Sequence, residues 1–285
     1  MSWPQFHFKC RFFTQYLQQG RTIAEAEQQY QNSGLSTLHS NHQLEPAQQS
    51  LFERAAVVSN KQVSAGLKVE HSALAYYAGL DLEQKLKASK KYESILNKLY
   101  YMVSLALIYI ALSSVHKVFV HPVFSEFIAQ YPRLNNPYFE AFNMVWMVGL
   151  IVSASIIAFS FMISVLIKNM DKIIIQGATQ WQKSILPKSI LLEVNELNNI
   201  ITLPIKDESL DSELYKKIHT ISELGLDKNI ELFSLFNKHT ERLEQKVWQM
   251  ISRMQLLLAP ILFCSIAFYI INIYIPIFSI GEVMS

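Results

Sequence analysis

Apolar residues are concentrated in three long runs, and between the runs apolar and polar positions alternate at helical spacing. The run Met254–Ile280 has 27 residues without a formal charge, and the run Phe142–Ile167 has 26. A third run, Leu99–Val120, is apolar except for His116 and Lys117 near its far end. About 20 apolar residues are enough for a helix to cross the ~30 Å hydrocarbon core of a bilayer. The pattern therefore predicts three transmembrane helices.

The predicted spans leave two hydrophilic parts, each long enough for a small helical domain. In chain order we expect a polar domain at 1–97, a span at 98–120, a short loop at 121–141, a span at 142–167, a second polar domain at 168–253, a span at 254–280 and a tail at 281–285.

Helix signals divide the first polar part. Gly20 interrupts a helical pattern that covers residues 5–30. Pro46 suits the first turn of another helix, which Gly66 ends. A further helix is expected from about Ser72 and could continue without a break into the first span.

The second polar part repeats this style. Pro187 and Pro204 bracket one helix, and Asp227 is expected to cap a long helix that leads into the third span. In each half a charged segment with the letters LEQK (81–92 and 242–254) precedes a span that ends Pro-x-Phe. We therefore predict an all-α membrane protein with three transmembrane helices and two cytoplasmic antiparallel helical-bundle domains that form an internal repeat.

Lysine and arginine residues predict the orientation, since positive charges beside spans are retained in the cytoplasm. Such residues lie next to the predicted spans, on the side of the two polar parts. They are Lys85, Lys87, Lys90, Lys91, Lys98, Lys168, Lys172, Lys183, Lys188, Lys238, Arg242, Lys246 and Arg253. The loop at 121–141 has only Arg133, and the tail has none. We expect both polar domains and the N-terminus in the cytoplasm, with the loop and the C-terminus outside.

The second predicted span carries small residues at close helical spacing. They form the pairs Gly149 with Ser153, Ala154 with Ala158, and Ser160 with Ser164. Small residues let helices approach closely in lipid, so these positions are candidates for packing against the other spans or a second copy. Serine and alanine are also common in any span, and the sequence favours neither interpretation. Asn143 and Asn272 are expected to bond across helices rather than to bind a substrate.

Nothing in the sequence points to an enzyme. No Gly-x-Ser-x-Gly, His-Glu-x-x-His, Walker A or Cys-x-x-Cys pattern occurs. His39 and His42 lie three residues apart in a polar segment but lack further ligands, so we expect no metal and no cofactor. The net charge of +2 indicates no particular partner, and no nucleic acid is expected.

Two stretches, 72–127 and 219–280, resemble the inner-membrane platform proteins of type II secretion systems and type IV pili. The first contains LYYMVSLALIYIALSSVHKVFVHPVFSEF, and the second contains RLEQKVWQMISRM before a span that ends in IPIF. That family has two homologous cytoplasmic helical domains and three spans, each domain followed by a span with a Pro-x-Phe outer edge. This chain is shorter than usual and has Tyr101-Met102 where Tyr-Pro often opens the first span, as in a divergent member.

The resemblance implies a non-enzymatic part of a bacterial inner-membrane machine. A cytoplasmic hexameric assembly ATPase, pilin or pseudopilin subunits, other inner-membrane assembly proteins, the lipid bilayer and further copies of the chain are the implied partners. The candidate surface for the motor, or for anionic lipid, consists of Lys85, Lys87, Lys90, Lys91, Lys216 and Lys217. A membrane-anchored sensor or a small-solute transporter subunit is the alternative.

Overall fold

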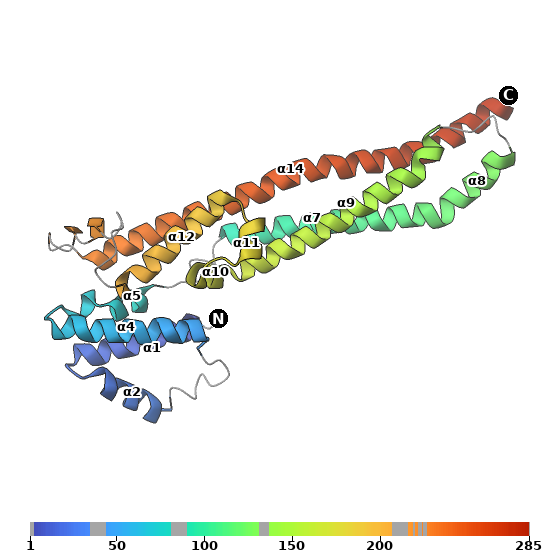
Figure 1. Cartoon of the computed structure of the whole chain (residues 1–285). Coiled ribbons are helices and arrows are strands. Elements are labelled where there is room, and N and C mark those ends of the chain that lie inside the picture. The colour runs from blue at the N-terminus through green and yellow to red at the C-terminus, as the bar shows by residue number, and fades with distance from the viewer. Residues whose placement is uncertain are drawn as a thin grey trace. The chain divides into compact units, whose positions relative to one another are not determined.

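The computed structural model describes residues 3–34, 44–80, 90–130, 137–206, 216–218, 220–221, 224 and 227–284, and the regular structure in these residues is all helical, with no strand (Figure 1). The chain divides into two compact units. The polar unit comprises residues 1–92 and 168–246, and the span unit comprises residues 93–167 and 247–285.

The N-terminal part of the polar unit follows the predicted start and stop signals. Its elements are α1 (Trp3–Gln18), α2 (Ile23–Asn32), α4 (Pro46–Ser64), the 3-10 turn η1 (Val69–His71) and α5 (Ala73–Gly79). Gly20 and Gly66 have φ values of 77° and 91°, which glycine adopts without strain, and each follows the end of a helix. Pro46 opens α4, and the Ser72 hydroxyl accepts from the Ala75 N–H at the start of α5, as predicted.

The structure corrects one expectation for this part. Helix α5 does not continue toward the first span, because it ends at Gly79 and Leu80 has an extended backbone, with ψ of 96°. Gly79 lies against the ring of Phe233, where an added Cβ would come within 2.9 Å of the ring. The residue therefore both ends the helix and allows the close contact.

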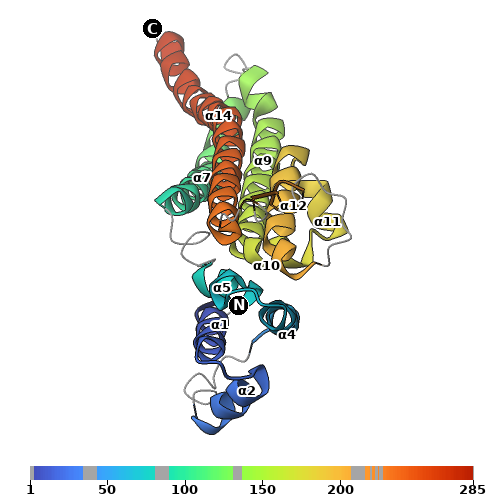
Figure 2. The same ribbon diagram turned by 90° about the vertical axis from the view of Figure 1, so that its left-hand side faces the viewer.

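Aromatic side chains form the core between α1, α4 and α5, and α5 lies beside both α1 and α4 (Figure 2). Phe13 and Phe52 meet edge to face with centroids 4.9 Å apart, and Phe6 meets Tyr77 at 5.8 Å. Leu74 is fully buried beside them. Burying a side chain of this size contributes about 1.5–3 kcal/mol, so these contacts account for the packing of three short helices.

Lys9 lies inside this core with 7% of its surface exposed. Its ammonium is 4.2 Å from the centroid of the Phe52 ring and also faces the rings of Phe13 and Tyr30. The Glu27 carboxylate is 3.3 Å away. An opposite charge and aromatic faces together compensate for the lost hydration of the cation.

The C-terminal part of the polar unit also follows its signals. It comprises α10 (Met170–Gln176), α11 (Gln180–Ile185), α12 (Lys188–Thr202), η4 (Leu203–Ile205) and the first part of α14 (Lys228–Met284). Pro187 directly precedes α12, and Pro204 lies in the 3-10 turn that follows it. The Asp227 carboxylate accepts from the Asn229 N–H at 2.9 Å, which confirms the predicted cap of the long helix.

The two polar segments share one unit, whereas the sequence predicts a separate domain for each. The Trp3 indole donates to the buried Asp171 carboxylate at 3.0 Å, and the Tyr77 hydroxyl donates to the Ile201 carbonyl at 2.6 Å. The Tyr76 ring stacks on that of Phe233, with centroids 5.1 Å apart. Buried polar atoms need partners, and here those partners come from the other segment.

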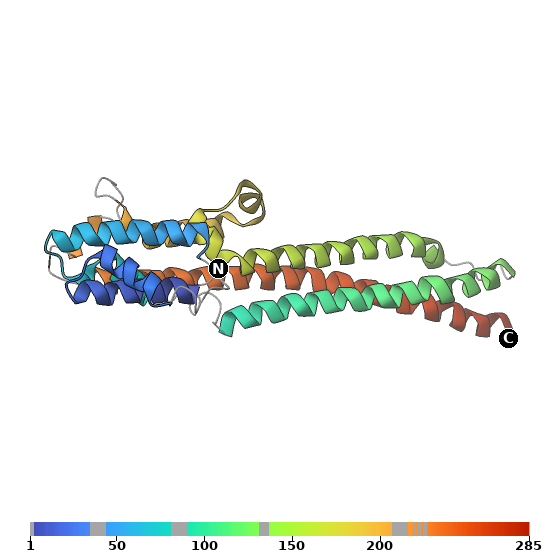
Figure 3. The ribbon, with the colours of Figure 1, turned by 90° about the horizontal axis from the view of Figure 1, so that it is seen from below.

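The span unit contains α7 (Lys90–Val115) from Glu93 on, a five-residue π-helical segment η2 (His116–Val120), α8 (His121–Gln130), α9 (Pro137–Lys168) and the rest of α14. α7, α9 and α14 run side by side here (Figures 1 and 3). Three helices in the described chain are long and apolar enough to cross a membrane, as predicted. Residues 121–130, assigned to the loop, are helical.

Large apolar side chains line the outside of the span unit. Phe161 is 72% exposed and Leu256 is 74% exposed. A smaller set packs inside, around Met102, Ala106, Tyr109, Ile156, Leu262 and Tyr269. An apolar exterior of this kind is what a helix bundle presents to lipid tails.

Candidate functional site

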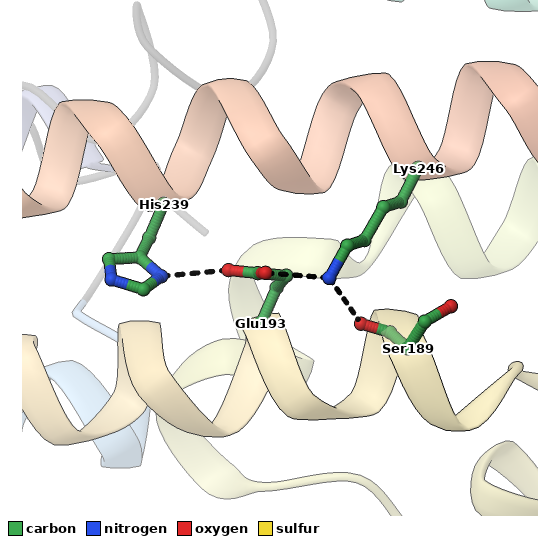
Figure 4. Close-up of polar contacts among 4 residues, drawn as sticks. All are labelled: Ser189, Glu193, His239 and Lys246. Carbon is green, nitrogen blue, oxygen red and sulfur yellow. Dashed lines mark hydrogen bonds and ion pairs between the residues drawn. The ribbon is translucent and has the colours of Figure 1, made fainter.

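The strongest cluster of charged groups in the polar unit joins α12 to α14. Glu193 on α12 accepts from Lys246 Nζ at 2.6 Å and from His239 Nδ1 at 2.7 Å, both on α14 (Figure 4). Lys246 also donates to the Ser189 carbonyl at 3.2 Å. An ionised carboxylate only accepts, so His239 carries a proton on Nδ1 in this contact. These four residues are the Glu193 cluster.

Helix periodicity explains why these side chains meet. Ser189 and Glu193 are one turn apart on α12, and His239 and Lys246 are two turns apart on α14. Each set therefore lies on one face of its helix. Buried apolar residues accompany both faces, including Ile190, Val194 and Leu197 on α12 and Phe236 and Leu243 on α14. Packing places the helices, and the Glu193 cluster then fixes how α14 is rotated against α12.

The electrostatics of the cluster favour the ionised carboxylate. Burial by itself raises the pKa of Glu193, but hydrogen bonds from Lys246 and His239, together with their charges, outweigh it. The pKa of Glu193 is therefore lowered below its ordinary value. The side chain of Glu193 is 9% exposed, against 17% for His239 and 33% for Lys246. The carboxylate is thus the buried centre, and its partners reach it from the outside.

A second group of contacts fastens the start of α14. His71 Nδ1 of η1 lies 3.2 Å from the Asp227 carboxylate, and the Asn229 amide donates to the Glu70 carbonyl at 2.9 Å. Asp227 also caps the helix. The first part of α14 is therefore tied to the N-terminal segment at its beginning and to α12 further along.

In the span unit, polar contacts join α14 to α7. Lys98 Nζ donates to Ser252 Oγ at 2.7 Å and lies 3.8 Å from the centroid of the Trp248 ring. Further along, the Tyr109 hydroxyl donates to that of Tyr269 at 3.2 Å. α14 thus has polar contacts in both units.

The predicted bond across helices is confirmed for Asn143. The Lys117 ammonium donates to the Asn143 side chain and lies 5.6 Å from the centroid of the Trp146 ring. This contact joins η2 to α9. The side chain of Asn272 lies outside the described residues.

The structure separates the small residues predicted for helix packing. Gly149, Ser153 and Ser160 are buried, whereas Ala154 and Ala158 are exposed. Ser164, the sixth candidate, is half-buried. At about 100° per residue, Ala154 and Ala158 lie roughly 140–180° around the helix from Gly149.

Gly149 makes the closest of these contacts. A Cβ placed there would lie 1.7 Å from the Tyr109 hydroxyl oxygen, so no larger residue fits without movement of α7 or α9. Ser153 and Ser160 bury their hydroxyls on the same face, and neither has a hydrogen-bond partner among the described residues. Size rather than polarity accounts for their place in the interface.

The basic residues proposed for a motor surface are placed only in part. Lys85 and Lys87 lie outside the described residues. Lys90 and Lys91 open α7, and Lys216 and Lys217 are exposed on a short helical stretch of the polar unit. The membership of these lysines in one surface stays a prediction.

Sequence reasoning did not single out the Glu193 cluster, although a signal was present. Glu193 falls within the apolar stripe of α12, next to Val194 and one turn from Ile190. His239 lies between Phe236 and Leu243 on the corresponding stripe of α14. A charge inside a buried stripe implies a partner, because an unpaired buried charge is costly.

His39 and His42 lie outside the described residues. Within the part of the chain that the structure describes, no group of three or more His, Cys, Asp or Glu side chains is arranged to hold a metal ion.

Comparisons with protein-family models, with curated proteins and with solved structures found no match.

Proposed function

We propose that this chain is an inner-membrane platform protein of a type IV pilus or a type II secretion machine. In this role it couples a cytoplasmic assembly ATPase to the insertion of pilin or pseudopilin subunits into a growing filament. The N-terminus and the polar unit face the cytoplasm, and the C-terminus faces the periplasm. The two polar segments are diverged copies of one helical bundle, each followed by a span.

One observation carries this proposal. α14 is a single helix of 57 residues that begins in the polar unit and continues through the third candidate span. At 1.5 Å per residue it is about 85 Å long. The helical backbone of α14 therefore passes from the polar unit to the span unit without an intervening loop.

The Glu193 cluster supports the same role. Glu193 of α12 binds α14 through His239 and Lys246, which are two turns apart. A rotation or shift of α12 therefore acts directly on α14. A coupling device needs a continuous connection between its soluble and membrane parts, and it needs no catalytic group. Within the polar unit, Lys216 and Lys217 are exposed and can take part in the motor contact, with Lys85, Lys87, Lys90 and Lys91 as further candidates.

The proposal is tested by purification of the tagged protein from its native membrane in mild detergent, with mass spectrometry of what is retained above an untagged control. We expect a hexameric secretion-type ATPase together with a prepilin or an inner-membrane assembly protein. Retention of a permease or a signalling kinase instead, or of no protein, would contradict the proposal and favour the transporter or sensor alternative.

A variant tests the motor surface. Lys216→Glu with Lys217→Glu is expected to lower recovery of the ATPase while the protein remains in the membrane fraction. The matched control is Lys61→Glu with Lys68→Glu, which reverses two exposed charges elsewhere on the polar unit. Equal recovery from both double variants would remove Lys216 and Lys217 from the motor surface.

A further inference from the structure

Helix α11 carries an exposed tryptophan, an exposed lysine follows two residues later, and a second exposed lysine opens α12. Trp181 is 49% exposed and is the most exposed of the four tryptophans. Lys183 and Lys188 are exposed as well, and α11 contains no buried residue. A large aromatic side chain left outside the core of the polar unit needs a physical explanation, since its burial would be favourable.

The neighbouring structure holds α11 in place. Gly177, with a φ of 83°, turns the chain away from α10, and Thr179 with Gln182 forms a capping box at the start of α11. Leu186, directly after the helix, is buried. The helix is therefore anchored on both sides while its own side chains stay accessible.

The charge of this segment has one sign. Residues 172–192 contain three lysines and no acidic residue. Lys172 is paired with Glu45 at 3.0 Å, and Lys183 and Lys188 have no acidic neighbour in sequence nearer than Glu193. The surface around α11 is thus suited to an anionic partner.

The nearest surface that combines anionic charge with an apolar layer is the bilayer itself. α9, a candidate span, ends at Lys168, and Trp181 follows 13 residues later. α10 takes up seven of these residues, so Trp181 is tethered within about 30 Å of the end of α9 however the units are arranged. Tryptophan favours the headgroup level, and lysines beside it favour anionic lipid.

We propose that α11 is an interfacial helix that binds anionic phospholipid headgroups, with Trp181 inserted at headgroup level and Lys183 and Lys188 facing phosphate. This contact fixes the polar unit against the bilayer on the side where α9 ends. It goes beyond the platform role and does not depend on it, because it requires only the span that precedes it.

The experiment uses the full chain in lipid nanodiscs that contain either phosphatidylcholine alone or phosphatidylcholine with phosphatidylglycerol. The fluorescence of Trp181 is obtained as the difference between the natural protein and Trp181→Phe. Lipids brominated near the headgroup end of their chains then report contact by quenching. We expect Trp181 to be quenched in the anionic discs and much less in the neutral ones.

Lysine variants show whether charge is responsible. Each lysine at an anionic surface strengthens binding by about fivefold, so Lys183→Ala with Lys188→Ala should weaken the contact by about 25-fold and abolish most of the quenching. The matched control, Lys61→Ala with Lys68→Ala, removes two exposed lysines elsewhere on the polar unit and should leave the quenching unchanged. Quenching that is equal in the two kinds of disc, or that persists in the Lys183 and Lys188 variant, overturns the proposal.

A protein occupant gives a different result. If α11 docks on a protein, Trp181 is not quenched in either kind of disc, and a photo-crosslinking residue placed at position 181 in cells captures protein rather than lipid. That outcome also overturns the proposal. It leaves the purification test of the platform role unaffected, so the two failures are distinguishable.

Discussion

The two units hold the same helix by different means. In the polar unit, α14 buries Phe236 and Leu243 and is gripped through charges by the Glu193 cluster. In the span unit, many of its described large apolar side chains are exposed, as Leu256 is, and Tyr269 supplies a neutral hydroxyl contact. In water, apolar burial drives packing. In lipid, apolar burial does not drive packing, so close fit and hydrogen bonds hold the helices together.

The largest expected effect comes from closing the space at Gly149. Gly149→Val places side-chain atoms where the Tyr109 hydroxyl lies, so the Tyr109 side chain must move or α7 and α9 must separate. Overpacking of this kind costs about 1–3 kcal/mol and here should reach the upper end. Thermal unfolding in detergent, followed by size-exclusion chromatography, measures the loss.

Ala158→Val is the matched control, since it adds the same kind of bulk to an exposed position of α9. Its stability should stay close to that of the natural protein. If both substitutions are tolerated equally, then close approach at Gly149 does not hold the span unit together.

The polar unit should be most sensitive at Glu193. Glu193→Ala leaves His239 and Lys246 without their shared acceptor, and hydrogen bonds to charged groups contribute about 1.5–3 kcal/mol. Lys246 can regain water, so we expect a loss of about 2 kcal/mol. Glu196→Ala, an exposed glutamate on the same helix, is the control and should be nearly neutral. Equal effects of the two would show that α12 and α14 are held by apolar contacts alone.

The stability of the polar unit should depend on pH through Glu193. The folded-state pKa of Glu193 is lowered, so its contribution is complete above the unfolded-state pKa of about 4.3 and is lost as the pH falls through the lower folded-state value. The stability difference between the natural protein and Glu193→Gln should therefore be constant near neutral pH. It should disappear in strongly acidic solution. A difference that grows on acidification would contradict this assignment.

The pattern of the sequence predicts the elements of this fold better than their contacts. The three spans, the break at Gly20 and the starts of α4 and α14 follow from composition, glycine conformation and capping chemistry, which are local properties. The end of α5 at Gly79 was missed, and so was the close contact between Gly79 and Phe233, which lies far away in sequence. Periodicity carries no information about such a neighbour.

The candidate site shows the same limit. Its residues could be suspected singly, because Glu193 interrupts an apolar stripe and Lys246 belongs to the LEQK segment. Their meeting depends on how α12 and α14 pack, which a single helix does not specify. Likewise, small residues on α9 were recognised as packing candidates, but their spacing alone could not tell the buried Gly149 from the exposed Ala158.

The smallest expected effect is the coupling energy between the hydroxyls of Tyr109 and Tyr269. Its measurement shows whether a pair of hydroxyls stabilises the spans, as charged groups stabilise the polar unit. Tyr109→Phe and Tyr269→Phe each remove one hydroxyl from the 3.2 Å contact, and the double variant removes both. Hydrogen bonds between spans have an average coupling energy of about 0.6 kcal/mol, so the double-mutant cycle should give a value near this. A coupling of zero would leave the contacts of Lys98 with Ser252 and Trp248, and the close packing around Gly149, to hold α7 in place.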